Sequence, residues 1–248
     1  MHKVILITGA SRGIGAATAE LAAARGYAVC VNYRSGKLAA EAIVERIQAT
    51  GGTAIAVRGD VSVEEQVVEL FQAVDEQLGT VTALVNNAGI LARQMNVADM
   101  DAARIQQILS VNVLGAMLCA REAVRRMSTR HGGRGGAIVN LSSIAARLGA
   151  PGEYVDYAAS KGAIDAMTIG LAREVAAEGI RVNAVRPGII DTDIHASGGE
   201  PGRVDRLKGF LPMQRGGRPE EVANAIMWLL ADDASYTTGA FIDVAGGR

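Results

Sequence analysis

Cysteine, histidine and aromatic residues are scarce in this sequence. Its 248 residues contain two cysteines, three histidines and 4% aromatic residues. Cys30 and Cys119 lie in apolar surroundings with neither CxxC spacing nor a disulfide framework, which predicts buried thiols in a reducing compartment. His2, His131 and His195 are scattered without the spacing of metal ligands, so we expect no metal site.

A surplus of charge of one sign is also missing, as are long apolar runs. The 25 basic and 26 acidic residues leave a net charge of −1, so nothing in the composition calls for nucleic acid or an anionic membrane. No run approaches the roughly 18 apolar residues of a membrane span, and the apolar start at 4–7 is much shorter than a signal-peptide core. We therefore expect a cytoplasmic protein with neither a nucleic-acid nor a membrane partner.

Apolar residues, by contrast, are abundant and periodic. They make up 49% of the chain, with a mean hydropathy of +0.19. Short apolar runs, expected as strands, alternate with segments of helical period. The expected strands are 3–8, 28–32, 53–60, 82–89, 136–143, 181–188 and 241–247; the expected helices lie near 13–25, 36–50, 63–79, a long region ending near 131, 153–179 and 219–231. This alternation predicts an α/β fold with a parallel sheet covered on both faces, in a single domain over 1–248.

Two glycine-rich patches interrupt the alternation. The patch at 131–136, "HGGRGG", is short and joins a helix to a strand, so we expect a plain turn. The segment at 193–217 is long and irregular, and such segments within a compact domain are lids, binding loops or disordered. We interpret it as a lid over a substrate site.

The stretch "TGASRGIG" at 8–15 lies between the first expected strand and the first expected helix. Glycines at 9, 13 and 15 let the backbone turn tightly and approach a pyrophosphate, which the N-terminus of the following helix attracts. Glycine spacing alone is a weak signal, but this position after the first strand of a βαβ series favours a dinucleotide site over a simple tight turn.

A tyrosine and a lysine four residues apart occur in "YAASK", at 157–161. Positions i and i+4 share one face of a helix, so Tyr157 and Lys161 can present a phenol and an ammonium to one reactant. Taken alone, the pair is more typical of an ordinary amphipathic helix. The other motifs decide between these interpretations.

Together the motifs resemble the short-chain dehydrogenase/reductase family, core type, which includes β-ketoacyl-carrier-protein reductases. The resemblance rests on "TGASRGIG", "NNAG" at 86–89, Asn112, Ser143, "YAASK" and "RPG" at 186–188, in the family's order, and it covers the chain from Val4 to the final "AGG". It implies a doubly wound Rossmann-type sheet of seven parallel strands in order 3-2-1-4-5-6-7, with NAD(P) lying across its carboxyl edge.

The resemblance implies catalytic roles for Asn112, Ser143, Tyr157 and Lys161. A carbonyl that accepts a hydride needs a proton donor on its oxygen, and the reverse reaction needs a base there. Lowering a tyrosine pKa from about 10 toward 7 takes ~4 kcal/mol. The interaction of the phenolate with one cation about 4 Å away, at an effective dielectric of about 20, supplies about that free energy. Lys161 is therefore expected to lower the pKa of Tyr157.

The other two residues have implied roles around this pair. Ser143 would hold the substrate oxygen, with Ser142 as the competing choice, and Asn112 would hold a water that relays protons to Lys161. Asn112 bonded only to the backbone of its surroundings is the alternative interpretation.

The implied cofactor is NADP. NAD-selective members carry an acid at the end of the second strand, whereas this chain has Tyr33 at that position, then Arg34, with Arg12 in the glycine loop. Two guanidiniums without a carboxylate suit a 2′-phosphate. The implied cofactor contacts are Gly9, Ser11, Arg12, Gly13, Ile14, Gly15, Arg34, Asp60, Val61, Asn87, Ala88, Gly89, Tyr157, Lys161, Pro187, Gly188, Ile190 and Thr192.

One departure from the family pattern affects the substrate. Ser143 and Tyr157 are fourteen residues apart, at the long end for the family, because "PGEYVDY" at 151–157 carries an extra residue. That loop is expected to line the substrate pocket. Tyr154 lacks a lysine four residues later, so we interpret it as a wall of the pocket.

These expectations lead to an NADPH-dependent reductase of a small-molecule carbonyl compound. A sugar or alcohol dehydrogenase working in the oxidative direction uses the same residues and is the alternative, whereas a non-catalytic dinucleotide sensor would be expected to lack Tyr157 or Lys161. The family's habit implies a homotetramer. Five arginines between Arg121 and Arg134 form either a docking patch for an acidic carrier protein or a solvated helix end.

Overall fold

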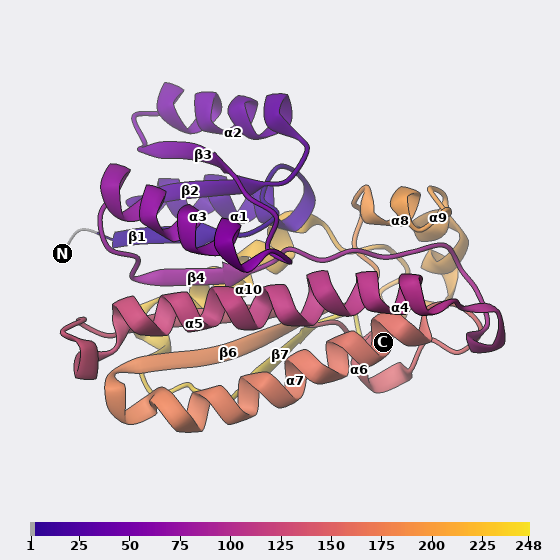
Figure 1. Cartoon of the computed structure of the whole chain (residues 1–248). Helices are drawn as coiled ribbons and strands as arrows, with labels where there is room; N and C mark the ends of the chain where they lie inside the picture. Colours follow the sequence, from indigo (N-terminus) through magenta and orange to yellow (C-terminus); the bar gives the residue numbers. More distant parts are fainter. Residues whose placement is uncertain (1–2) are drawn as a thin grey trace.

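The computed structural model describes residues 3–248, and these residues form one parallel sheet of seven strands. The strand order is β3-β2-β1-β4-β5-β6-β7, and every neighbouring pair is parallel, which confirms the predicted topology (Figure 1). The strands are β1 Lys3–Ile7, β2 Tyr27–Tyr33, β3 Ala54–Arg58, β4 Ala83–Asn86, β5 Gly136–Leu141, β6 Ile180–Pro187 and β7 Phe241–Val244.

Helices cover both faces of the sheet, as expected for strands that are apolar on both sides. One face is packed by α1 (Gly13–Ala24), α2 (Lys37–Ala49) and α10 (Pro219–Leu230). The opposite face is packed by α3 (Glu64–Gln77), α5 (Gly115–Met127) and α7 (Val155–Val175) (Figure 1). Each of these helices lies within a few residues of its predicted position.

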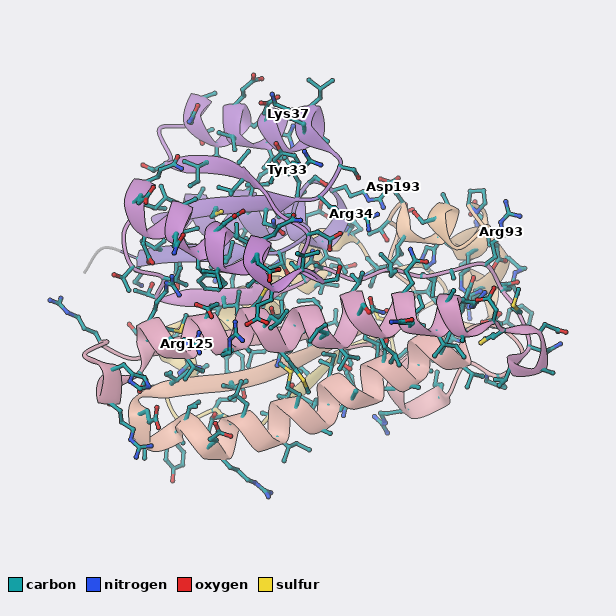
Figure 2. All side chains as sticks on the ribbon, in the orientation of Figure 1. Tyr33, Arg34, Lys37, Arg93, Arg125 and Asp193 are labelled. Carbon is teal, nitrogen blue, oxygen red and sulfur yellow. The ribbon has the colours of Figure 1, made fainter. Side chains whose placement is uncertain are left out.

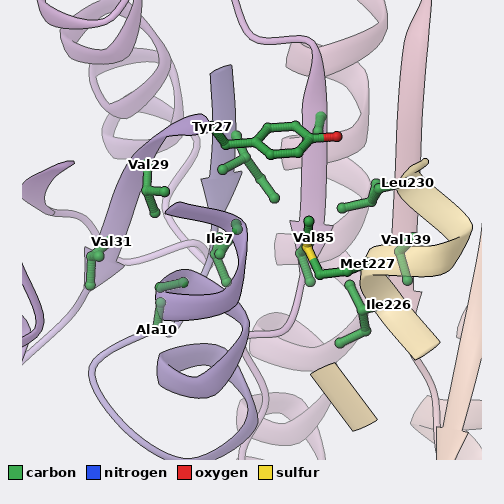
Figure 3. Packing of buried hydrophobic residues seen from close by; sticks show 14 of the residues in the cluster. Ile7, Ala10, Tyr27, Val29, Val31, Val85, Val139, Ile226, Met227 and Leu230 are labelled. Carbon is green, nitrogen blue, oxygen red and sulfur yellow. The ribbon is translucent and has the colours of Figure 1, made fainter. Parts of the chain in front are cut away.

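Successive side chains of a strand point to opposite faces, so one strand serves two cores. Ile5 and Ile7 of β1 join the α1–α2–α10 core, part of which is shown in Figure 3, while Val4 and Leu6 join the core under α3, α5 and α7. All four are essentially inaccessible to solvent. This double burial explains why the strand runs read as continuous apolar stretches instead of alternating ones.

Both cysteines are free and buried, as predicted. Burial raises the pKa of Cys119 to about 12 and raises that of Cys30 further, so neither thiol has thiolate character near neutral pH. Among residues 3–248, no three His, Cys, Asp or Glu side chains gather in a group that could hold a metal ion.

The long helical region is continuous from Ala102 to Met127. It consists of α4 (Ala102–Leu109), a π-helical turn η2 (Ser110–Leu114) and α5. Within residues 3–248 it is the one helical segment whose length and mean hydropathy would suffice to cross a membrane, which differs from the expectation that no stretch approaches a membrane span. Packing explains part of this apolarity. The helix α5 contacts both β4 and α3, and the helix α4 contacts α7.

The connections hold the remaining short helices. The patch at 131–136 is a turn that follows η3 (Thr129–His131), as predicted, with Gly132 and Gly135 at positive φ. The segment at 193–217 contains α8 (Ile194–Ser197), α9 (Arg203–Leu207) and η5 (Lys208–Phe210), and α6 (Ala145–Leu148) follows β5. Single 3-10 turns complete the chain: η1 (Val97–Asp99), η4 (Ala176–Glu178) and η6 (Asp232–Ala234).

Candidate functional site

The carboxyl ends of β1 and β4 border the point where the strand order reverses. From β1 the sheet grows through β2 and β3 in one direction and through β4 to β7 in the other. Open parallel sheets bind ligands at such a switch point. A groove opens there, lined by parts of 9–14, 32–36, 59–61, 87–90 and 192–194, and a cavity lies beside it.

The glycine loop passes very close to the end of β4. Gly9 has φ +60°, and a Cβ there would lie 2.9 Å from the Cα of Ala88. A Cβ on Gly15 would lie 2.6 Å from the amide nitrogen of Asn87. Both separations are too short for a side chain, so the loop needs glycine at these positions.

The first turn of α1 has no competing acceptor of its own. Arg12 occupies the N-cap position without a side-chain capping bond, and no acidic residue lies in the first turn. The initial N–H groups of a helix lack partners within the helix, and its dipole favours an anion. The glycine loop and α1 therefore fit the phosphates of a dinucleotide.

Two asparagines hold the loop in place. The side-chain nitrogen of Asn87 donates to the carbonyls of Thr8 at 2.8 Å and Gly9 at 3.0 Å, and the N–H of Gly9 donates to Asn32 Oδ1 at 3.1 Å. Asn87 is a predicted cofactor residue, whereas the role of Asn32 was not predicted. An asparagine at the end of the apolar run 28–32 was the signal that could have revealed this role, because a polar side chain there needs hydrogen-bond partners.

Two arginines reach the groove near the end of β2, where a 2′-phosphate is predicted. Arg34 is 55% exposed, and its guanidinium lies 3.8 Å from the carboxylate of Asp60. Arg12 donates to Ser197 Oγ at 3.4 Å. Figure 2 shows Arg34 beyond the end of β2, on the side of Asp193, and both residues line the groove. Tyr33 is 7% exposed and packs in the core, so the end of β2 presents no carboxylate of its own.

The other predicted cofactor residues are divided between the groove and the cavity. The groove and the cavity adjoin, because both are lined by Ile14, Asn87, Gly89 and Thr192. The groove is further lined by Ser11, Gly13, Asp60, Val61 and Ala88, and the cavity by Pro187, Gly188 and Ile190.

Three of the four predicted catalytic residues meet in the cavity. Ser143 follows the end of β5, while Tyr157 and Lys161 stand one turn apart on the first turns of α7. Lys161 is 4% exposed, and its Nζ donates to the carbonyl of Leu141 at 2.6 Å. Burial lowers the pKa of Lys161 to about 8, and the nearby carboxylate of Asp165 acts in the opposite direction.

The pKa of Tyr157 differs from the sequence-based expectation. Burial raises it to about 12, and only the hydrogen bond with the Ser143 hydroxyl acts to lower it. The ammonium of Lys161 gives its hydrogen bond to Leu141 and lies 5.5 Å from the centroid of the Tyr157 ring. Desolvation of the phenol thus outweighs the effect that we expected from Lys161.

The two neighbouring serines have different partners. Ser142 is 3% exposed, and its hydroxyl donates to Asp165 Oδ1 at 2.6 Å. Ser143 accepts a hydrogen bond from the N–H of Ala145 at 3.1 Å and hydrogen-bonds Tyr157. The geometry therefore favours Ser143 over Ser142 as the serine that contacts a substrate oxygen next to Tyr157.

Asn112 lies behind the cavity at the π-helical turn η2. Its side chain accepts from the N–H of Ile90 at 2.8 Å and donates to the carbonyl of Ile90 at 3.1 Å and to Ser160 Oγ at 3.0 Å. The π turn was not predicted, although such turns recur at functional sites. The two bonds to Ile90 match the interpretation as a backbone-bonded asparagine, whereas the bond to Ser160 is to a side chain. A Cβ added to Gly89 would lie 3.5 Å from both Asn112 Oδ1 and Lys161 Nζ, so these two side chains lie near one another.

The loop before α7 and the segment at 193–217 close the far side of the cavity. The loop before α7 and the end of α6 contribute Leu148, Ala150, Glu153 and Tyr154 to the lining of the cavity. The segment at 193–217 contributes Ile194, His195 and Arg203. Ala150 has φ +45°, an uncommon backbone conformation for a non-glycine residue, at the loop that the sequence marked as one residue longer. Sequence analysis assigned neither His195 nor Arg203 to the site.

The arginines between 121 and 134 are largely paired with carboxylates. Glu122 is 4% exposed and binds Arg121, Arg125 and Arg126. Further partners are Glu64 for Arg121, Asp75 for Arg126 and Glu178 for Arg130. This pairing favours a structural role for most of these arginines.

Comparison with known proteins agrees with this geometry. The family model described as enoyl-(acyl carrier protein) reductase matches residues 9–248. The chain is 60% identical over 245 residues to YgfF, an uncharacterised oxidoreductase of Escherichia coli K12, with 99% of each chain covered. It is 39% identical over 246 residues to a 3-oxoacyl-[acyl-carrier-protein] reductase of Synechocystis, covering 99% of this chain and 96% of that protein.

A solved structure supports the same relationship. A double mutant of a Serratia marcescens short-chain dehydrogenase/reductase matches with a TM-score of 0.90 and 31% identity, covering 99% of this chain and 97% of that one. The sheet order, the glycine loop, and these relatives agree over nearly the whole sequence. The chain is therefore an oxidoreductase that belongs to the short-chain dehydrogenase/reductase family.

Proposed function

We propose that the protein is an NADPH-dependent reductase of carbonyl compounds. The observation that carries this proposal is that Ser143, Tyr157 and Lys161 line one cavity that adjoins the groove of the glycine loop. A reactant carbonyl in the cavity would lie beside a dinucleotide in the groove. The relatives named 3-oxoacyl-[acyl-carrier-protein] reductases support the reaction class.

Each residue has a chemical role in the proposal. NADPH, when bound, supplies the hydride. Ser143 holds the carbonyl oxygen, and Tyr157 donates its phenolic proton to that oxygen. A pKa of about 12 keeps the phenol protonated at neutral pH, which suits a proton donor in the reductive direction. Lys161 holds the end of β5 through its bond to Leu141 and supplies positive charge beside the phenol. It also lies near Asn112, from which a proton could be returned to Lys161 and Tyr157.

The choice of NADP over NAD rests on charge at the end of β2. Arg12 and Arg34 line the groove with Ser11 and Ser35, whereas Tyr33 is buried. Guanidiniums bind phosphate through charge-assisted hydrogen bonds, often in pairs. We also propose that residues 1–248 form one domain, that the protein works in the cytoplasm on small molecules, and that the segment at 193–217 acts as a lid.

A carbonyl panel with a matched variant tests this function. The panel contains β-ketoacyl thioesters, keto sugars, diketones and quinones, and NADPH absorbance reports turnover. Tyr157→Phe removes only the phenolic oxygen, so we expect it to keep its fold and its affinity for NADPH while losing at least about a hundredfold in kcat. Near-wild-type turnover in Tyr157→Phe would refute the role of Tyr157, and failure of the wild type on every carbonyl would refute the function.

A further inference from the structure

Two buried polar atoms without partners lie in the wall of the cavity. Within residues 3–248, four buried side-chain atoms lack a hydrogen-bond partner, and two of them, Tyr154 Oη and His195 Nδ1, belong to residues that line the cavity. Tyr154 is 3% exposed and His195 is 8% exposed. A buried polar atom without a partner is costly, so such atoms in a ligand cavity point to a ligand group that completes them.

The hydrogen bond of His195 Nε2 determines which kind of group can bind Nδ1 of the same ring. Its Nε2 lies 2.8 Å from the carbonyl oxygen of Ile190. A carbonyl only accepts, so Nε2 carries the proton. Burial lowers the pKa of His195, which leaves the ring neutral at pH 7 and Nδ1 as a bare acceptor. The group that completes Nδ1 must therefore donate a hydrogen bond.

Tyr154 faces the same segment from the opposite side. It is the N-cap residue of α7, and a Cβ on Gly198 would come within 3.2 Å of its hydroxyl. The amide of Gln94 donates at 2.7 Å to Glu200, and it lies close enough to Tyr154 to act against the burial that raises the pKa of this phenol. The hydroxyl and the His195 acceptor are both covered in this structure, and both belong to residues that line the same cavity.

Charge in this part of the cavity is already balanced. Arg203 is 5% exposed, and its guanidinium donates to both carboxylate oxygens of Glu153 and, at 2.8 Å, to Glu200. These contacts use three of the five N–H donors of Arg203 and pair its charge with two carboxylates. A carboxylate that enters beside Arg203 would therefore lie next to the carboxylates of Glu153 and Glu200, and like charges brought together in a buried site are costly.

We propose that Tyr154 Oη and His195 Nδ1 form a hydroxyl-binding subsite, so that the substrate is an uncharged carbonyl compound that carries at least one hydroxyl group. A hydroxyl can donate to His195 Nδ1, and a hydroxyl can accept from or donate to Tyr154 Oη. The subsite rests on the proposed carbonyl reductase function and narrows its substrate class to hydroxyketones and hydroxyaldehydes. Simple ketones and keto acids are disfavoured.

Matched ketones test the subsite without assuming a distance to the reacting carbonyl. The probes are 2-hexanone, its four derivatives with a hydroxyl on carbon 3, 4, 5 or 6, and 5-oxohexanoate as the carboxylate. We expect the wild type to reduce at least one hydroxyketone with a kcat/KM at least about tenfold above that of 2-hexanone and of 5-oxohexanoate. Tyr154→Phe and His195→Leu should each reduce this preference, taken as the ratio of kcat/KM for the hydroxyketone to kcat/KM for 2-hexanone, about tenfold and mainly through the KM of the hydroxyketone.

Control variants separate the subsite from a structural effect. Tyr236→Phe and His131→Leu make the same chemical changes at exposed positions and should keep the wild-type preference. Tyr154→Phe preserves the shape of the ring, so it remains informative if His195→Leu does not fold. The subsite is overturned if the wild type shows no preference for a hydroxyketone or prefers 5-oxohexanoate. It is also overturned if Tyr154→Phe lowers kcat/KM equally for the hydroxyketone and for 2-hexanone, since an equal loss would indicate a bound water or a packing role for Tyr154. Failure on every carbonyl of both panels would instead refute the proposed function itself.

Discussion

Arg34 is the residue whose removal most directly tests the choice of cofactor. Its side chain is 55% exposed in the groove, and its contact with Asp60 is long, at 3.8 Å, so replacing it should leave the fold intact. A hydrogen bond to a charged group is worth about 1.5–3 kcal/mol, so Arg34→Ala should weaken NADPH binding about ten- to a hundredfold. Binding of NADH, which has no 2′-phosphate, should hardly change.

Titration calorimetry with both cofactors measures this difference directly. Lys37→Ala is the matched control, because Lys37 is an exposed cation that is not among the residues lining the groove and pairs with Glu41. A wild-type preference for NADH would contradict the NADP proposal, as would an equal loss of both cofactors in Arg34→Ala.

Lys161 makes a separate prediction about stability and pH. Its pKa is about 8 in the folded protein against 10.5 for an ordinary lysine. Between these values the unfolded chain binds a proton that the folded protein lacks, so this group makes folding more favourable as pH rises. From pH 7.5 to 9.5 we expect the wild type to gain about 1–2 kcal/mol of unfolding free energy relative to Lys161→Met.

Urea unfolding at the two pH values measures the effect. Lys37→Met removes a lysine that is 69% exposed and should follow the wild type. Parallel pH profiles for the wild type and Lys161→Met would show that the ammonium is not desolvated as the structure indicates.

Residue identities were predicted better than residue properties. The i, i+4 pair of Tyr157 and Lys161 and the tight approach of Gly9 depend on local geometry, which the sequence encodes directly. The pKa of Tyr157 depends on how much of the fold covers the phenol, and the sequence-based estimate counted one cation without that burial. The roles of Asn32, His195 and Arg203 likewise arise from contacts between elements far apart in the chain.

At the scale of elements, strand and helix positions could be predicted because both faces of the sheet are buried. Two local features could not. The π-helical turn at 110–114 leaves no mark in the apolar period of the helix, and the short helices α8 and α9 lie in a segment without regular period. The π-helical turn borders the groove through Val111, and α8 and α9 border the cavity. In both places contacts between elements, and not local sequence, determine the backbone.

The junction of the glycine loop and α1 gives a prediction at this scale. A Cβ on Gly15 would lie 2.6 Å from Asn87 Nδ2 and 2.8 Å from Ala10 Cα, so Gly15→Ala must displace the loop or the end of β4. We expect a loss of about 1–3 kcal/mol of unfolding free energy and at least about tenfold weaker NADPH binding. Thermal unfolding and titration calorimetry measure the two effects.

A second glycine supplies the control for this substitution. Gly162 lies within α7, and a Cβ there would meet nothing within 4 Å. Gly162→Ala should therefore keep NADPH affinity and stabilise the helix by up to about 1 kcal/mol. Unchanged cofactor binding in Gly15→Ala would contradict the close approach of loop and strand.

At the scale of the whole molecule, an apolar surface remains on the long helical region. Leu109, Leu114 and Met117 are 41%, 46% and 47% exposed, and they border a shallow hollow with Ile105, Val113 and Ala163 from α4, η2 and α7. Contiguous apolar surface of this kind marks an interface. Its presence explains why Ala102–Met127 is apolar beyond what packing on the sheet requires.

We propose that a second copy of the chain covers this surface and that the protein is a homotetramer, as the family resemblance implied. β7 lies at the end of the sheet and pairs with β6 alone among the described residues, so it offers a second surface for assembly. Light scattering should therefore give a mass near four times the 25.7 kDa of one chain.

Leu114→Glu places a charge on the apolar surface and should reduce this mass at least twofold. Leu38→Glu, at an 83% exposed position on α2, should leave the mass unchanged. A wild-type mass near that of one chain would contradict the assembly, and a Leu114→Glu variant that remains tetrameric would place the interface elsewhere.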